Sequence, residues 1–337
     1  MSDSTPPPSE PPPPGLPAFN RARRRARERG RGGTFGSRAF WLWSVTFVAA
    51  LAIVYWKRQQ SEVEAHRARL LARQRALEAD LGPLFYPLRE RFERWTTETA
   101  RADWADEAPA GGAEAVRALL EKPGVYLRLP APDARTNDAI RQAAPSSLKD
   151  LFVAGLLRAP AADPRRGKAC ASTRECAAGE VCNEAGYCAV PEQPYNLRVA
   201  YRGARALSET WVHEVEVAQE PLRLRMYEND LDAALAADLP VAVDLLKRAQ
   251  YFLVVVDEVP PGLARAPGQG LAEAVQAAPH AARVALYEVP RERRVFRSRH
   301  ELDADLQTSA SPEGRDAQRR QVLNAELAQK VRAALGL

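Results

Sequence analysis

Four cysteines, the only ones in the protein, lie within nineteen residues at equal spacing: Cys170, Cys176, Cys182 and Cys188. Thiols this close together can form two disulfide bonds or supply four thiolate ligands to a zinc ion. Structural zinc sites usually contain a Cys-x2-Cys knuckle, and none occurs here. A segment this short cannot form a hydrophobic core without cross-links. The spacing therefore predicts two disulfide bonds in one of three pairings, with a zinc site as the alternative.

Histidine and carboxylate side chains offer little further chemistry. The four histidines are dispersed, and no two stand at metal-ligand spacing: His66, His213, His280 and His300. His213 precedes Glu214 but lacks the second histidine of a zinc-protease helix. Asp257 ends the apolar run 251–256, where a strand often presents a functional group, but its neighbour Glu258 would point to the opposite face. Asp257 and His213 remain as candidate site residues, and the sequence predicts no catalytic, cofactor-binding or metal-ligating set.

The cysteine segment carries the one resemblance to known proteins. Residues 176–188 read Cys-Ala-Ala-Gly-Glu-Val-Cys-Asn-Glu-Ala-Gly-Tyr-Cys. This stretch resembles the short cysteine-rich modules of exported bacterial proteins, in which glycines occupy the turns between disulfide bridges. The resemblance covers residues 170–188 only. It implies a location outside the cytoplasm and a covalent staple, and it implies no activity.

Residues 39–56 form an uncharged apolar run of eighteen residues. A helix of that length spans about 27 Å, close to the hydrocarbon thickness of a bilayer. Aromatic residues typical of membrane–water interfaces mark both ends of the run: Trp41, Trp43, Tyr55 and Trp56. The run therefore predicts a single transmembrane helix that stays in the membrane as a signal-anchor. The alternative is a signal sequence cleaved after Ala52, but residues 53–56 are still apolar and the segment before the run is long.

The net charge of +5 is confined to the N-terminal tail. Residues 1–38 contain eight arginines and three acidic residues, so the other 299 residues carry no net charge. That balance argues against nucleic acid as a partner. Eight basic residues precede the apolar run closely and six follow it at similar distance. The positive-inside rule then predicts a cytoplasmic N-terminus and a C-terminal part outside the cytoplasm, in agreement with the predicted disulfides.

The remaining chain is divided by its composition and its helix-breaking residues. A tail rich in proline and arginine cannot bury a core, so it is predicted to be disordered. The predicted segments are a disordered cytoplasmic tail (1–38), the transmembrane helix (39–56), a juxtamembrane helix (57–82), a mainly helical domain (83–160), a cysteine-rich module (168–190) and a mixed α/β domain (195–337).

The juxtamembrane helix has an apolar residue every seventh position: Val63, Leu70, Leu77 and Leu84. A single apolar heptad position is a weak coiled-coil signal, because the partner positions are polar. Two interpretations follow, a parallel homodimer through residues 57–81 or a helix packed on its own downstream domain. Gly82-Pro83 is expected to end this helix.

Periodicity predicts the elements beyond that point. We expect strands at 125–129, 197–201, 211–217, 222–226 and 251–259. A hairpin is expected from 283–289 and 294–299, and helices at 87–104, 113–121, 136–158 with a break at Pro145, 231–237, 241–250 and 315–335. The order of helices and strands, with an antiparallel hairpin, indicates the α+β class.

Together these features predict a single-pass protein of the bacterial inner membrane whose periplasmic part serves interaction or assembly, without enzymatic activity or a cofactor. Its expected partners are the lipid bilayer and another envelope protein. Two alternatives are a membrane-tethered extracytoplasmic hydrolase and a transmembrane sensor without an output domain. A concave polar pocket with convergent carboxylates or His213 would favour the enzyme, whereas a flat apolar patch or an exposed sheet edge would favour the binding protein.

Overall fold

A computed structural model describes most of the chain. The described residues are 34–101, 104–148, 151–158, 165–171, 175–177, 180–183, 185–191, 193–235, 239–303 and 312–337. The predicted tail therefore lies largely outside the described residues. The chain forms two compact units, residues 1–65 and residues 66–337, and each is described by itself.

The first unit contains the N-terminal part of helix α2 (Thr34–Thr99), and this part includes the predicted apolar run. The helix is long and apolar enough to cross a membrane, and no residue of its most apolar window is buried by the protein. Two hydroxyls within this part donate to backbone carbonyls one turn earlier, Ser44 to Phe40 at 2.8 Å and Thr46 to Leu42 at 2.5 Å. Such bonds satisfy polar groups that an apolar solvent would leave unpaired.

Within the second unit, α2 continues to Thr99 without interruption, so the predicted break at Gly82-Pro83 is wrong. Pro83 and Pro87 lie inside the helix, and both are exposed. Proline has a helix-compatible φ angle, and the lost backbone hydrogen bond on the solvent side is outweighed by packing on the other side. The buried large apolar side chains of this part of α2 are Leu70, Leu77, Phe85, Phe92 and Trp95.

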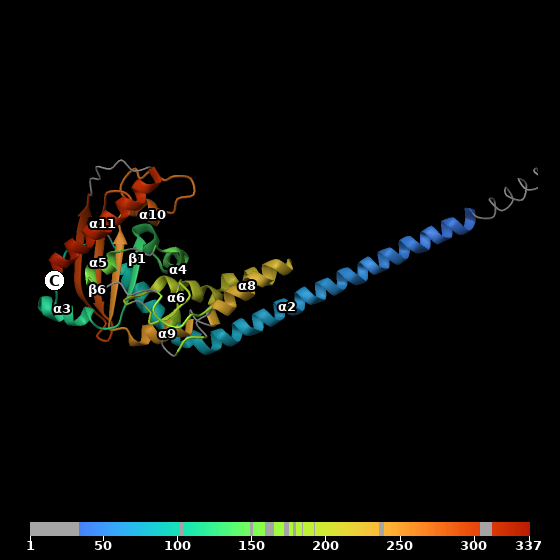
Figure 1. The fold of residues 1–337 in the computed structure, drawn as a ribbon, viewed down its shortest axis with the longest axis horizontal. Coiled ribbons are helices and arrows are strands. Elements are labelled where there is room, and N and C mark those ends of the chain that lie inside the picture. The colour runs from blue at the N-terminus through green and yellow to red at the C-terminus, as the bar shows by residue number, and fades with distance from the viewer. Residues whose placement is uncertain are drawn as a thin grey trace, which may run out of the picture. The chain divides into compact units, whose positions relative to one another are not determined.

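A five-stranded mixed sheet forms the centre of the second unit, in the order β4-β1-β5-β6-β7 (Figure 1). Strands β4, β1 and β5 are parallel, whereas β6 and β7 are antiparallel additions that form the predicted hairpin. The strands are β1 (Gly124–Pro130), β4 (Tyr195–Asn196), β5 (Tyr251–Asp257), β6 (His280–Glu288) and β7 (Arg293–Leu302). The predicted strands at 125–129 and 251–259 and the hairpin are therefore confirmed, and the unit contains both helices and a mixed sheet.

Helices cover both faces of this sheet. On one face, Leu253 and Val255 of β5 belong to a core with Leu327 and Val331 of α11 (Pro312–Leu335). On the other face, the Phe252 ring packs 5.0 Å from that of Phe92 in α2. The alternation of side chains along β5 thus separates two cores. The first face also carries α3 (Gly112–Leu120) and α5 (Phe152–Leu157), and the second carries α6 (Leu197–Ala204) and α9 (Leu239–Arg248).

Three predicted strands are helices in the structure. Residues 197–201 lie in α6, residues 211–217 in α7 (Glu209–Val217) and residues 222–226 in α8 (Pro221–Ala233). Each of the first two helices begins with a capping side chain, which accepts from a backbone N–H at 3.0 Å in α6 and 3.1 Å in α7. Apolar residues four apart are buried, as with Trp211 and Val215. Helix capping and this spacing outweigh the β propensity of the residues.

Smaller elements complete the unit. They are η1 (Ala131–Ala134), α4 (Asn137–Ala143), η2 (Ala144–Ser146), η4 (Arg205–Leu207), α10 (Leu271–Gln276), β2 (Val181–Cys182) and β3 (Cys188–Ala189). The predicted helix at 136–158 is divided into α4, η2 and α5, and the predicted break at Pro145 falls within η2. The predicted C-terminal helix is confirmed as α11.

The outer edge of β7 is covered by the segment 104–110. Glu107 donates its N–H to the Arg297 carbonyl at 2.9 Å, and Ala110 donates to the Val295 carbonyl at 2.8 Å. The Arg299 N–H donates to the Asp106 carboxylate at 2.9 Å. The backbone groups along this stretch of the edge are therefore paired within the chain, which removes a template for strand addition.

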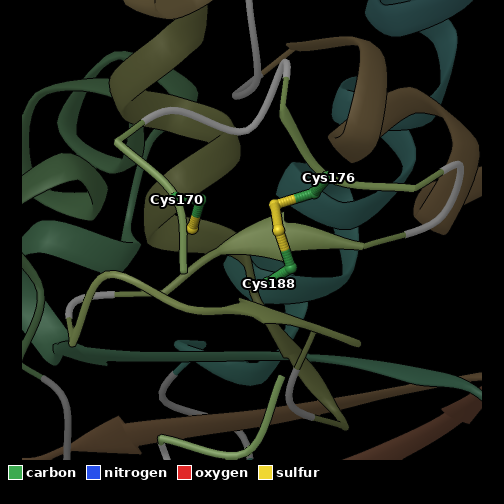
Figure 2. A group of neighbouring side chains, drawn as sticks. All are labelled: Cys170, Cys176 and Cys188. Carbon is green, nitrogen blue, oxygen red and sulfur yellow. A yellow bond between two sulfur atoms is a disulfide. The ribbon is translucent and has the colours of Figure 1, made fainter. Parts of the chain in front are cut away.

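The cysteines form two disulfide bonds, Cys170–Cys182 and Cys176–Cys188, as predicted. Figure 2 shows the second bond beside Cys170. The sulfurs of Cys170, Cys176 and Cys188 lie within 4.8 Å of one another, a spacing that a metal site also needs, but each of them is bonded to sulfur. Gly186 occupies a turn with a φ of 79°, in line with the role of glycine that the resemblance implies.

Candidate functional site

The best-developed polar site lies where two parallel strands end. Arg128 is near the end of β1, and Asp257 is the last residue of the neighbouring β5. The chain leaves β1 toward β4 on one side and leaves β5 toward β6 on the other. Adjacent strands whose connections diverge at their carboxyl ends form the place where open α/β sheets usually bind ligands.

Arg128 and Asp257 form a bidentate ion pair. The Arg128 Nε lies 2.7 Å from Asp257 Oδ2, and its Nη2 lies 2.9 Å from Oδ1. Both side chains point to the α11 face, and they are 1% and 0% exposed. The planar guanidinium fork matches both carboxylate oxygens, which is the strongest geometry for such a pair.

His280, the first residue of β6, approaches the same carboxylate. Its Nε2 lies 3.1 Å from Asp257 Oδ1, and its Nδ1 lies 2.7 Å from the Ala278 carbonyl oxygen. Both partners are hydrogen-bond acceptors. The ring is therefore held between the Asp257 carboxylate and the backbone at the start of β6.

Two amide side chains close the site. Gln276 of α10 donates to Asp257 Oδ2 at 3.5 Å, and Arg128 Nη1 donates to the Asn324 oxygen of α11. Both amides are buried. We call these five residues the buried polar cluster: Arg128, Asp257, Gln276, His280 and Asn324. The cluster joins β1, β5, β6, α10 and α11 at one end of the sheet.

The electrostatics of the cluster favour an ionised Asp257. Burial alone would raise the pKa of this carboxyl, but the charge of Arg128 and the hydrogen bonds from His280 and Arg128 together hold the pKa well below its usual range. A carboxylate with such a low pKa, occupied by four donor contacts, is a poor proton acceptor at neutral pH. In this conformation the cluster can fix neighbouring elements, but its side chains are closed to a substrate.

A second buried carboxylate lies on the opposite side of the sheet. Glu93 of α2 is fully buried and receives two bonds from Arg141, at 2.9 and 2.8 Å, and one from the Tyr201 hydroxyl at 3.4 Å. Burial, followed by the charge of Glu93, raises the pKa of Tyr201 well above its usual value. A hollow beside this group, lined by Phe85 and Arg89 among others, has space for about one water molecule.

The predicted site residues have different surroundings. Asp257 belongs to the buried polar cluster. Glu258 points to the opposite face, as expected, where Arg299 and Arg283 donate to it at 2.9 and 2.6 Å and hold its pKa below the usual value. His213 is exposed on α7 and lies outside the cluster.

Sequence reasoning missed four members of the cluster: Arg128, Gln276, His280 and Asn324. One signal was available for the first, since Arg128 interrupts a predicted strand of otherwise apolar residues and faces the same side as Tyr126. A charge at an inward position requires a buried partner of opposite sign. The sequence did not specify which strand would supply that partner.

No protein-family model, curated protein or solved structure matches this chain.

Proposed function

We propose that this protein is a single-pass protein of the bacterial inner membrane that presents residues 66–337 in the periplasm for interaction or assembly, without enzymatic activity. Support for the anchor comes from the exposed apolar helix and from the charge difference across it. Support for an extracytoplasmic location comes from the two disulfide bonds, which persist in oxidising compartments.

The observation that carries the non-enzymatic part of the proposal is the closure of the polar cluster. The cluster lies at the end of the sheet where α/β proteins usually have catalytic groups. Its charged side chains are paired with one another. The other buried carboxylate, Glu93, is likewise neutralised by arginine. Such saturated groups support a folded scaffold. Because the β7 edge is already paired, we expect partners to bind helical surfaces rather than to add a strand there.

Location is tested with a membrane-impermeant maleimide on intact spheroplasts. After treatment with an impermeant reductant, all four cysteines should react, and without reductant none should react. A matched control is Ser9→Cys, placed in the tail on the other side of the apolar run, which should react only after the membrane is broken. Labelling of the native cysteines without reductant, or labelling of position 9 in intact spheroplasts, would contradict the proposed topology.

The interaction role is tested by photo-cross-linking in membranes at near-native expression. We expect one envelope protein to be recovered repeatedly, and we expect the reciprocal experiment from that partner to return this chain. Purified full-length protein that turns over model ester, peptide or glycoside substrates, with loss of turnover in Asp257→Asn, would instead support the tethered hydrolase.

A further inference from the structure

Three apolar side chains are exposed around the turn between α7 and α8. Val217 ends α7, and Leu222 and Met226 stand one turn apart on α8, with exposed fractions of 53%, 70% and 60%. We call these three residues the α7–α8 patch. The other exposed large apolar side chains among the described residues 66–337 are scattered along the sequence: Leu84, Leu151, Val190 and Val322.

The patch follows from the helical periodicity of α8. Leu224, Tyr227 and Leu231 form the buried side of this helix, so Leu222 and Met226 point away from the core. The Tyr227 ring packs edge-on against the buried Trp211 ring of α7, with centroids 5.8 Å apart. The two helices are thus held together by their buried sides, and the patch contributes nothing to that packing.

A hydrogen bond ties this turn to a defined point on α2. Arg67 Nη2 donates to the Ala218 carbonyl at 2.6 Å. Arg67 follows Trp56, the last residue of the predicted membrane span, by only eleven residues. Eleven residues reach roughly 16 Å as a helix and roughly 40 Å when fully extended. This short tether limits how far the α7–α8 turn can lie from the membrane in which α2 is proposed to be anchored, in any orientation of the second unit.

The charges in the first half of α8 suit an anionic surface. Its first seven residues, Pro221–Tyr227, include the exposed Arg223 and Arg225 and no acidic residue. Of the three acidic residues of its second half, Glu228 lies 3.1 Å from His66 of α2 and Asp232 bonds with Arg73 of α2, whereas Asp230 is exposed. Exposed Glu216 and Glu220 stand at the turn itself and oppose this preference in part. Apolar side chains interleaved with arginine are typical of helices that bind at the headgroup level of membranes.

We propose that the α7–α8 patch docks on the anionic phospholipid surface of the membrane that anchors the chain. The proposal rests on the proposed membrane anchor and adds a second contact to it. Leu222 and Met226 enter the interfacial region, Arg223 and Arg225 meet lipid phosphates, and the second unit is held in one orientation above the bilayer. That orientation determines which helical surfaces remain available to a protein partner.

The test uses the full chain reconstituted in vesicles of phosphatidylethanolamine with about one quarter phosphatidylglycerol. A benzophenone amino acid replaces Leu222 in one variant, Val190 in a second and Val48 in a third. Leu222 and Val190 are matched in exposure, at 70% and 71%, and Val48 lies in the apolar run. After irradiation, mass spectrometry measures the fraction of protein that carries a lipid adduct. We expect about fivefold more adduct at 222 than at 190, and a clear loss of adduct at 222 in phosphatidylcholine vesicles.

Two further variants test the cause of that adduct. With the probe at 222, Met226→Glu should reduce the lipid adduct several-fold, because a carboxylate is repelled by anionic lipid and is costly to bury in the interface. Leu151→Glu changes another exposed apolar residue and should leave the adduct unchanged.

The outcomes separate the two proposals. No lipid adduct at position 48 would refute the membrane anchor and hence the proposed function. Adduct at 48 but equal yields at 222 and 190 would refute the docking surface and leave the anchor intact. Cross-linking of position 222 to a second copy of the chain in these vesicles, or to another protein in native membranes, in place of lipid would also overturn the proposal.

Discussion

Asp257→Asn is the substitution that most directly tests the buried polar cluster. The amide keeps the size of the carboxylate and one acceptor oxygen, but it removes the negative charge beside Arg128. Both side chains are essentially inaccessible to solvent, so water cannot replace the lost anion. Removal of one partner of a buried ion pair costs about 3–5 kcal/mol of unfolding free energy. For a unit of this size, that loss lowers the melting temperature by roughly 10 °C.

The measurement is thermal unfolding of the full chain in detergent with its disulfides intact. Near-ultraviolet circular dichroism reports on the core, because the rings of Trp95 and Tyr287 stack with centroids 5.0 Å apart. The control is Asp244→Asn, which removes an exposed aspartate that pairs with Arg248 one turn later on α9. An exposed pair of this kind contributes about 0.5 kcal/mol or less. A cost below about 1 kcal/mol for Asp257→Asn would refute the interpretation of the cluster as a buried charge pair.

Two extensions sharpen this test. Removing both charges with Arg128→Met and Asp257→Asn should recover about 1–3 kcal/mol relative to the single variant, because no buried charge is then left unpaired. The pH dependence has a defined sign, since the folded-state pKa of Asp257 is lowered. The stabilisation is complete above the unfolded-state pKa of about 3.9 and is lost as the pH falls below it. The difference between wild type and Asp257→Asn should therefore stay constant from neutral pH to about pH 5 and shrink below about pH 4.

Four further predictions follow from single contacts. Leu70→Ala should lower the free energy of unfolding by about 2–5 kcal/mol and Leu84→Ala by less than about 1 kcal/mol, because only Leu70 is buried within its own chain. Denaturant titration measures both losses. Gly124→Ala should unfold the protein at a much lower temperature, since the new Cβ would lie 2.2–2.4 Å from ring atoms of the buried Tyr251. Proteolysis without reductant should yield peptides that join the first cysteine to the third and the second to the fourth. Burial lowers the pKa of His300, so the free energy of unfolding should fall as the pH drops below about 6.5, the unfolded-state pKa of histidine. His300→Gln should reduce this pH dependence of the melting temperature.

The elements that sequence predicts correctly are those with strong local signals. The apolar helix, the disulfides, the continuous β-branched run of β5 and the amphipathic α11 each carry their own pattern within a short window. The errors arise where a local signal competes with a second local signal or with tertiary packing. Residues 197–201 and 211–217 are rich in strand-forming residues, but Asn196 and Ser208 cap helices at these positions. Gly82-Pro83 is a helix-breaking pair that tertiary packing of α2 overrides.

The heptad leucines show why local pattern leaves an interaction undecided. Leu70 and Leu77 are buried in the second unit, whereas Leu84 is partly exposed. A seven-residue repeat predicts a buried stripe on a helix, and it does not specify whether the covering surface is another chain or the same one. In this chain two positions of the stripe are buried by the chain itself, which leaves less apolar surface for the predicted parallel homodimer.

The buried polar cluster could not be predicted because its register is non-local. Arg128 and Asp257 are 129 residues apart, and the chain between β1 and β5 includes the cysteine module, β4 and α6 to α9. The β1–β5 pairing places Arg128 opposite Val255 and Pro130 opposite Asp257, so both charges face α11. A shift of β1 by one residue would turn Arg128 to the opposite face, and both charges would be buried without a partner. The ion pair therefore raises the free-energy cost of a shifted register between β1 and β5, two strands that pair only after a long connection has closed. The apolar side chains around the pair add no comparable cost.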